Sequence, residues 1–144
     1  MTLLWYVPGG PMENEGGRDS SVENGVRVDV ESEYLPERSD PTAGIWVHAY
    51  HVQIINAGAE RVQLVNRHWI ITNSHGVEHH VQGVGVVGEQ PWLDVGEAYR
   101  YTSGCPMDTA VGTMHGSYEM ATESGETFRA EIKPFTLAEP YALN

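Results

Sequence analysis

Basic residues are scarce in this 144-residue sequence, which has eight Lys and Arg against 20 Asp and Glu, and Lys133 is its only lysine. The formal net charge is therefore −12 at pH 7. Because so acidic a surface repels phosphate backbones and anionic lipid headgroups, we expect no nucleic-acid partner and no membrane partner. A cation or a basic protein surface is the partner that this charge favours.

Cysteine is also scarce, because Cys105 is the only one in the chain. A single cysteine excludes an intramolecular disulfide framework and is typical of a reducing compartment. The sequence has no apolar run near the ~18 residues of a membrane-spanning helix. Its short apolar N-terminal run has no Lys or Arg before it, unlike a signal peptide. These absences predict a cytoplasmic protein.

The length predicts one domain, which at this size buries about two-thirds of the surface of its unfolded chain. The chain contains 16 glycines and 8 prolines, a composition that favours many turns over long helices. Residues 1–21 are polar and rich in turn formers and have no hydrophobic period. We therefore predict a flexible N-terminal extension at 1–21 and a folded domain at 22–144.

Apolar residues alternate with polar ones along most of the predicted domain, as in Val26, Val28 and Val30. This period of two is typical of half-buried strands. The same pattern recurs at 46–54, 62–71, 77–82, 99–102, 114–120 and 128–132. About seven strands of this size predict an all-β fold, an antiparallel β-sandwich of two sheets.

Three irregularities are expected within these strands. The apolar parity of Val62 and Leu64 differs from that of Trp69 and Ile71, and this switch predicts a β-bulge between Asn66 and Arg67. Pro134 lacks a backbone donor and is expected to interrupt the last strand. Residues 93–99 have the form of a tyrosine corner, in which the phenol of Tyr99 would bond the backbone upstream and lock a crossover.

Gly83, Gly85 and Gly88 form a G-x-G-x-x-G motif. In a dinucleotide-binding fold such glycines lead from a strand into a helix whose N-terminus holds pyrophosphate. Here the following residues contain Pro91 and lack helical periodicity, so we do not expect that fold. Two interpretations remain open: a glycine-rich strand that allows close backbone approach, or a backbone nest that holds a pyrophosphate-type anion.

Seven histidines are present, and the densest group comprises His75, His79 and His80. Imidazole is a good ligand for zinc, cobalt and nickel, so these three are candidate metal ligands. Adjacent residues on a strand point to opposite faces, so a site needs a bend or a ligand from elsewhere, such as His68 or His115. The alternative is that these histidines are simply solvated in a loop.

Other chemistry is sparsely supported. His48 lies on the apolar face of its strand, where a hydrogen-bonded histidine at the edge of the core is expected. Ser103 and Ser117 lack the strand–turn–helix context of a nucleophile elbow, and no basic residue near Cys105 in sequence would activate its thiol. We therefore expect no catalytic residues, no enzyme activity and no cofactor.

Several motifs occur in one order along the chain: RHWIITN at 67–73, VQGVGVVGEQP at 81–91, YTSG at 101–104, GTMHGSYEM at 112–120 and PFTL at 134–137. Together they resemble the ApaG family, over about residues 22–144. The resemblance implies a β-sandwich of the fibronectin type III or immunoglobulin kind, in agreement with the period-two pattern.

The resemblance also carries expectations about function. Bacterial ApaG proteins are associated with cobalt resistance and magnesium efflux, and related eukaryotic domains act as interaction modules. We therefore expect a non-catalytic module that binds an unidentified protein and influences divalent-cation homeostasis indirectly; a homodimer is also open. The alternative is a protein that holds a pyrophosphate-type ligand or a divalent cation near Gly83, Gly85 and Gly88, a motif that the family shares.

Overall fold

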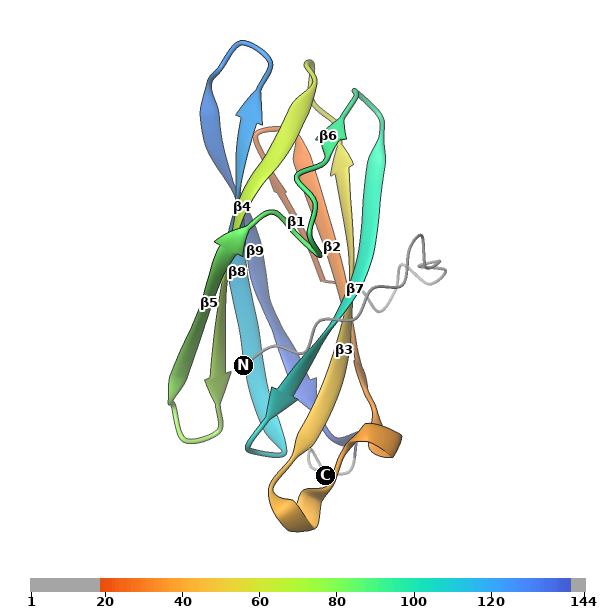
Figure 1. Cartoon of the computed structure of the whole chain (residues 1–144), viewed down its shortest axis with the longest axis vertical. Coiled ribbons are helices and arrows are strands. Elements are labelled where there is room, and N and C mark those ends of the chain that lie inside the picture. Colours follow the sequence, from red (N-terminus) through yellow and green to blue (C-terminus); the bar gives the residue numbers. More distant parts are fainter. Residues whose placement is uncertain (1–18, 141–144) are drawn as a thin grey trace.

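The computed structural model describes residues 19–140, which form two antiparallel sheets packed face to face (Figure 1). The first sheet has the order β1 (Asp19–Glu23), β2 (Val26–Tyr34), β3 (Trp46–Asn56) and β7 (Ala98–Met107). The second has the order β5 (Glu78–Val84), β4 (Val62–Asn73), β8 (Val111–Thr122) and β9 (Thr127–Ala138), and the short β6 (Trp92–Leu93) pairs with β4. The predicted all-β sandwich is confirmed.

Two 3-10 turns lie between β2 and β3. They are η2 (Pro36–Arg38) and η3 (Pro41–Ala43), and each begins with a proline. Proline suits this position because its φ is already helical and its missing N–H is not needed there. None of the helices in this part of the chain is long and apolar enough to cross a membrane.

The predicted boundary between extension and domain needs a small correction. Strand β1 begins at Asp19, which pairs with Val30 of β2, so residues 19–21 belong to the first sheet. The rest of the predicted extension, residues 1–18, lies outside the described residues. Asn24 and Gly25 connect β1 to β2 with φ values of 51° and 81°. Asn-Gly with two positive φ angles is the sequence signal for a tight hairpin, and it could have placed β1.

The alternating apolar residues face inward and form one core between the sheets. Trp69 of β4 is 1% exposed and lies at the centre of an aromatic group. Its ring meets Tyr50 of β3 edge-on, with centroids 5.3 Å apart, and meets Tyr118 and Phe135 at 6.1 Å. Edge-to-face pairs of this kind stabilise a core beyond the effect of their buried area.

Two register shifts adjust the second sheet. The predicted bulge in β4 is present between Leu64 and Asn66, slightly earlier than expected. The expected interruption at Pro134 is also present, and β9 continues beyond it to Ala138. A second register shift, between Met114 and Gly116 of β8, lies opposite the proline. A bulge leaves a residue out of the ladder, so a residue without an N–H is tolerated there.

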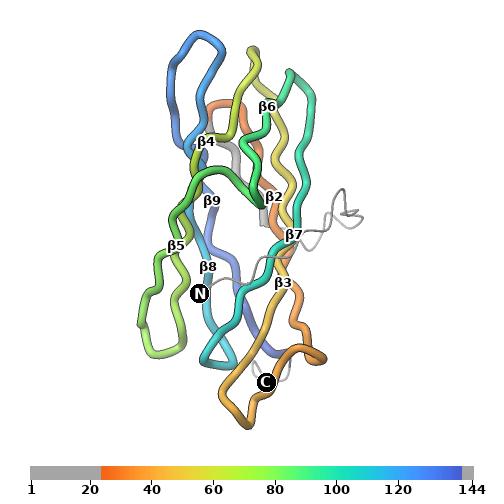
Figure 2. Tube along the Cα trace, viewed as in Figure 1, coloured from red at the N-terminus to blue at the C-terminus, as the bar shows by residue number. Residues whose placement is uncertain are grey.

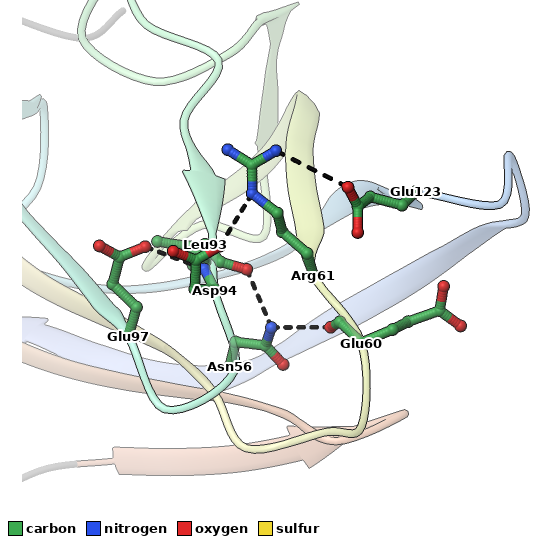
Figure 3. A network of polar contacts seen from close by, with 7 residues as sticks. All are labelled: Asn56, Glu60, Arg61, Leu93, Asp94, Glu97 and Glu123. Carbon is green, nitrogen blue, oxygen red and sulfur yellow. Dashed lines mark hydrogen bonds and ion pairs between the residues drawn. The ribbon is translucent and has the colours of Figure 1, made fainter.

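The corner between β6 and β7 is held by side-chain hydrogen bonds. The Tyr99 hydroxyl donates to the carboxylate of Glu89. The buried side chain of Asn56 fastens the corner, donating to the backbone oxygens of Glu60 at 2.9 Å and Leu93 at 3.0 Å (Figure 3).

Arg61 extends the network at this corner. Its Nε lies 2.9 Å from an Asp94 carboxylate oxygen, and its Nη1 lies 4.0 Å from Glu123 (Figure 3). Its guanidinium also stacks over the Trp92 ring, 4.7 Å from the centroid. Ion pairs this exposed add little stability, about 0–1 kcal/mol each. The buried amide of Asn56 is therefore the stronger fastening of the corner.

Candidate functional site

The glycine-rich segment follows β5 and forms a tight turn, with no helix after it. In Figure 2 the green trace arches away from β5 and returns at β6. Val86 donates to the Glu89 oxygen at 2.8 Å, and Glu89 donates back at 2.9 Å. Val87 and Gly88 between them have φ values of 42° and 83°. Two positive φ angles define a type I′ turn, so the helix of a dinucleotide site is absent from this segment.

Gly85 allows two backbone segments to cross closely. Its φ is +63°, and a Cβ atom added there would lie only 2.1 Å from the backbone oxygen of Glu89. Its N–H donates to the oxygen of Val65, the bulge residue of β4, at 2.8 Å. The turn is therefore attached to β4 at the bulge, and only glycine fits at this position.

Gly83 leaves room for the side chain of Arg67. A Cβ atom at Gly83 would lie 2.8 Å from Nη1 of Arg67. This nitrogen donates to the backbone oxygens of Val84 and Gly85, at 3.2 and 3.0 Å. A guanidinium thus faces the carbonyl groups of the loop, an arrangement that disfavours a cation at that point.

Most amide donors of the loop are already engaged within the protein. The N–H groups of Gly85, Val86 and Glu89 all donate to backbone oxygens. An anion-binding nest needs neighbouring N–H groups that point together at the ligand. The geometry therefore matches the close-approach interpretation of the motif, and an anion near this loop would be bound mainly by side chains.

A polar hollow of about 630 Å³ lies beside the glycine loop, on the outward side of the second sheet. The strands β4, β5, β8 and β9 each contribute to it. Its polar lining includes Asn66, Arg67, His68, Gln82, Ser117, Glu119 and Arg129. Two of the chain's seven arginines therefore line the hollow together with one carboxylate, that of Glu119, which accepts a hydrogen bond from Asn66 at 2.6 Å. The sequence alone did not indicate this hollow, because its lining comes from four strands that only the fold brings together.

The three predicted metal ligands are not brought together. His75 lies in the turn after β4, where its N–H donates to the Asn73 side chain at 2.9 Å. His79 lines an apolar groove of about 390 Å³ with Ile71 and other residues, whereas His80 lies on the other side of the strand. Within residues 19–140, no three His, Cys, Asp or Glu side chains are placed to hold one metal ion.

Of the three nucleophile-type side chains that the sequence offered, Cys105 and Ser103 lie in the core, whereas Ser117 lines the hollow. Burial raises the pKa of the Cys105 thiol to about 12, and Ser103 is fully buried. Burial likewise raises the pKa of Tyr50, Tyr101 and Tyr118 above the ordinary phenol range. A nucleophile or base must reach both its substrate and its reactive protonation state near neutral pH. These buried groups meet neither requirement.

His48 is buried as expected, at 1% exposed, but its Nε2 has no hydrogen-bond partner among the described residues. Its ring lies 5.3 Å from that of Tyr34 between centroids. The expected hydrogen bond is therefore not made at this nitrogen. Burial lowers the pKa of His48 to about 4.

Much of the sandwich, including the glycine loop, matches a known protein family. The family model of the ApaG domain, also designated DUF525, matches residues 36–122. The chain belongs to the ApaG family. This match confirms the resemblance that the sequence motifs indicated, and the glycine loop, the hollow and the corner at Asn56 all fall largely within it.

Relatives are similar over most of their length. Protein ApaG of Methylobacterium radiotolerans is 50% identical over 117 residues, which cover 81% of this chain and 90% of that protein. Protein ApaG of Shewanella putrefaciens is 46% identical over 125 residues, which cover 87% and 99%. A crystal structure of a Bordetella pertussis protein called ApaA matches with a TM-score of 0.79 and 46% identity, over 81% of this chain and 94% of that one.

Proposed function

We propose that the chain is a non-catalytic protein-interaction module of the cytoplasm whose contact surface is the polar hollow. The observation that carries this proposal is a contrast in exposure. Cys105 and Ser103 are buried, whereas the hollow opens outward and is lined by Arg67 and Arg129 together with Glu119. Arginine suits this role because its planar guanidinium binds carboxylates through paired hydrogen bonds.

The edge strand β5 adds a second recognition element. It borders the hollow at the outer edge of the second sheet, and Val84 at its end is 67% exposed. Edge strands carry backbone N–H and C=O groups that can pair with another chain. A partner segment with a carboxylate for the arginines, within otherwise basic surroundings, would complement both the hollow and the acidic remainder of the surface.

The proposed role in divalent-cation homeostasis acts through that partner. Its support is the resemblance to bacterial ApaG proteins associated with cobalt resistance and magnesium efflux. At the glycine loop the carbonyl oxygens of Val84 and Gly85 face Arg67, so direct cation binding there is disfavoured. An indirect effect through a bound protein is compatible with this geometry.

Charge reversal on β9 tests the proposal. Arg129 lines the hollow, whereas Lys133 is exposed on the same strand but is not part of the hollow's lining. Both Arg129→Glu and Lys133→Glu change the net charge by the same amount. We expect Arg129→Glu to reduce co-purification of the partner from the native host at least about tenfold, since breaking a buried charge contact costs several kcal/mol. Quantitative mass spectrometry of the tagged chain measures it.

The control variant Lys133→Glu can contradict the proposal. If Lys133→Glu reduces the same partner as strongly, only the overall charge matters and the hollow is not the contact surface. If no partner depends on either residue, or if purified protein shows a turnover that Glu89 or Ser103 variants abolish, the interaction proposal is wrong. A second copy of the chain recovered in the same way would identify a homodimer.

A second candidate function is binding of a pyrophosphate-type anion in the hollow. The observation in its favour is that Arg67, Arg129 and His68 line one space beside the glycine turn, against a single carboxylate, that of Glu119. At a pyrophosphate concentration 100 times the dissociation constant, binding would stabilise the protein by about 2.7 kcal/mol. We expect any such thermal shift to disappear in Arg129→Ala and to persist in Lys133→Ala. No shift at millimolar pyrophosphate or diadenosine tetraphosphate excludes this candidate.

A further inference from the structure

Two histidines from neighbouring strands meet on the outward side of the second sheet. His68 of β4 pairs in register with Gln82, and His80 of β5 pairs with Ile70, so the two histidines are diagonal neighbours on one face. Nε2 of His68 lies 2.8 Å from Nδ1 of His80, and the ring centroids are 5.0 Å apart. This contact joins two ring nitrogens directly.

Glu78 orients the second ring. Its Oε1 lies 3.3 Å from Nε2 of His80, and a carboxylate can only accept a hydrogen bond. His80 therefore donates from Nε2, and in its neutral form the lone pair of this ring is on Nδ1, toward His68. A carboxylate that fixes the outer nitrogen of an imidazole is the usual support of a metal-binding histidine.

We propose that His68 Nε2 and His80 Nδ1 chelate one divalent transition-metal ion, with Glu78 as the supporting acceptor. Two nitrogens that each lie at a bonding distance of about 2.0–2.1 Å from one ion are separated by ~2.9 Å at a right angle. The distance of 2.8 Å is close to that spacing. Right-angled nitrogen ligands suit the tetragonal geometry of Cu(II) and Ni(II).

The site differs from the predicted group and from the glycine loop. Of His75, His79 and His80, only His80 takes part, and its partner His68, one of the two additional ligands that the sequence suggested, comes from another strand. The ligand His80 and its supporting acceptor Glu78 lie near the surface, with side chains that are 45% and 57% exposed. Water can therefore complete the coordination shell, and the net charge of −12 attracts cations toward it. On binding, the ion replaces the hydrogen bond between the rings, and the His68 proton moves to Nδ1.

Calorimetric titration of tag-free protein with CuCl₂ and NiCl₂ tests the site. We expect one ion per chain, with binding weakened about 100-fold in His68→Ala and in His80→Ala and about tenfold in Glu78→Gln. His79→Ala and His115→Ala are the matched controls and should retain wild-type affinity. Electron paramagnetic resonance of the Cu(II) form should show two coupled nitrogens, reduced to one in either ligand variant.

Two results would overturn the proposal. One is the absence of saturable Cu(II) or Ni(II) binding at millimolar metal. The other is equal affinity of wild type, His68→Ala and His80→Ala, which would place the ion elsewhere. Because all of these side chains are partly exposed, circular dichroism should show unchanged melting without metal, so that a loss of affinity is not a loss of fold.

Discussion

Gly85→Ala is expected to destabilise the protein by roughly 2–5 kcal/mol. An alanine there would strain the backbone, because φ is positive, and there is no space for its methyl group. The residue has φ +63°, and the new Cβ atom would lie 2.1 Å from the backbone oxygen of Glu89. The turn would have to open, which would also loosen the bond from Gly85 N–H to Val65. Urea unfolding followed by tryptophan fluorescence measures the loss.

Gly88→Ala is the matched control for this result. Gly88 also has a positive φ, +83°, but no atom lies within 4 Å of an added Cβ. Its variant should therefore lose only the backbone-strain part, about 1–2 kcal/mol. Equal losses in the two variants would contradict the close crossing at Gly85 and would reopen an anion-binding explanation of the motif.

Acidification is expected to destabilise the fold through His48. Burial lowers its pKa in the folded protein to about 4, from an ordinary value of 6.5. Between these two pH values the unfolded chain binds a proton that the folded protein does not, so stability is lost as the pH falls below 6.5. At ~1.4 kcal/mol per pKa unit, the loss is about 2 kcal/mol between pH 7 and pH 5 and about 3 kcal/mol once the pH is near 4.

His48→Phe removes this titration while keeping a ring against Tyr34. The free energy of unfolding of the variant should depend less on pH than that of the wild type, by about 2 kcal/mol between pH 7 and pH 5. At pH 7 the variant should not be much less stable, because it also removes a buried nitrogen without a described partner. His75→Ala, in the exposed turn, is the control. Parallel pH profiles of wild type and His48→Phe would refute the role of His48.

The strands and the core could be predicted because they depend on local alternation. Val26, Val28 and Val30 are each 1% exposed, and the parity change in β4 marks a real bulge. The sequence Asn24-Gly25 also indicates the tight turn between β1 and β2. The predicted extension at 1–21 nevertheless overlaps the first three residues of β1. The interruption at Pro134 was predictable from its missing N–H, whereas the bulge of β8 that accommodates it depends on strand pairing, which a single strand does not reveal.

The contacts within the candidate sites depend on the register between paired strands, and the sequence alone does not show this register. The glycine spacing was conspicuous, but the roles of Gly83 and Gly85 follow from Arg67 and the bulge in β4, which are distant in sequence. Likewise, the sequence grouped His80 with its neighbours along the chain and left the additional ligand open between His68 and His115, whereas strand pairing places His68 against His80. The residues were visible in sequence, but their partners were set by strand pairing.

Photo-crosslinking tests the central claim, that the hollow on the second sheet is the contact surface. A photoreactive phenylalanine analogue can replace either Val84, which lines the hollow and is 67% exposed, or Val95, which is 56% exposed at the corner between β6 and β7. We expect a discrete crosslinked protein in the native host from position 84 only, lost when Arg129→Glu is added. Equal crosslinking from both positions, or none from position 84, would contradict the claim.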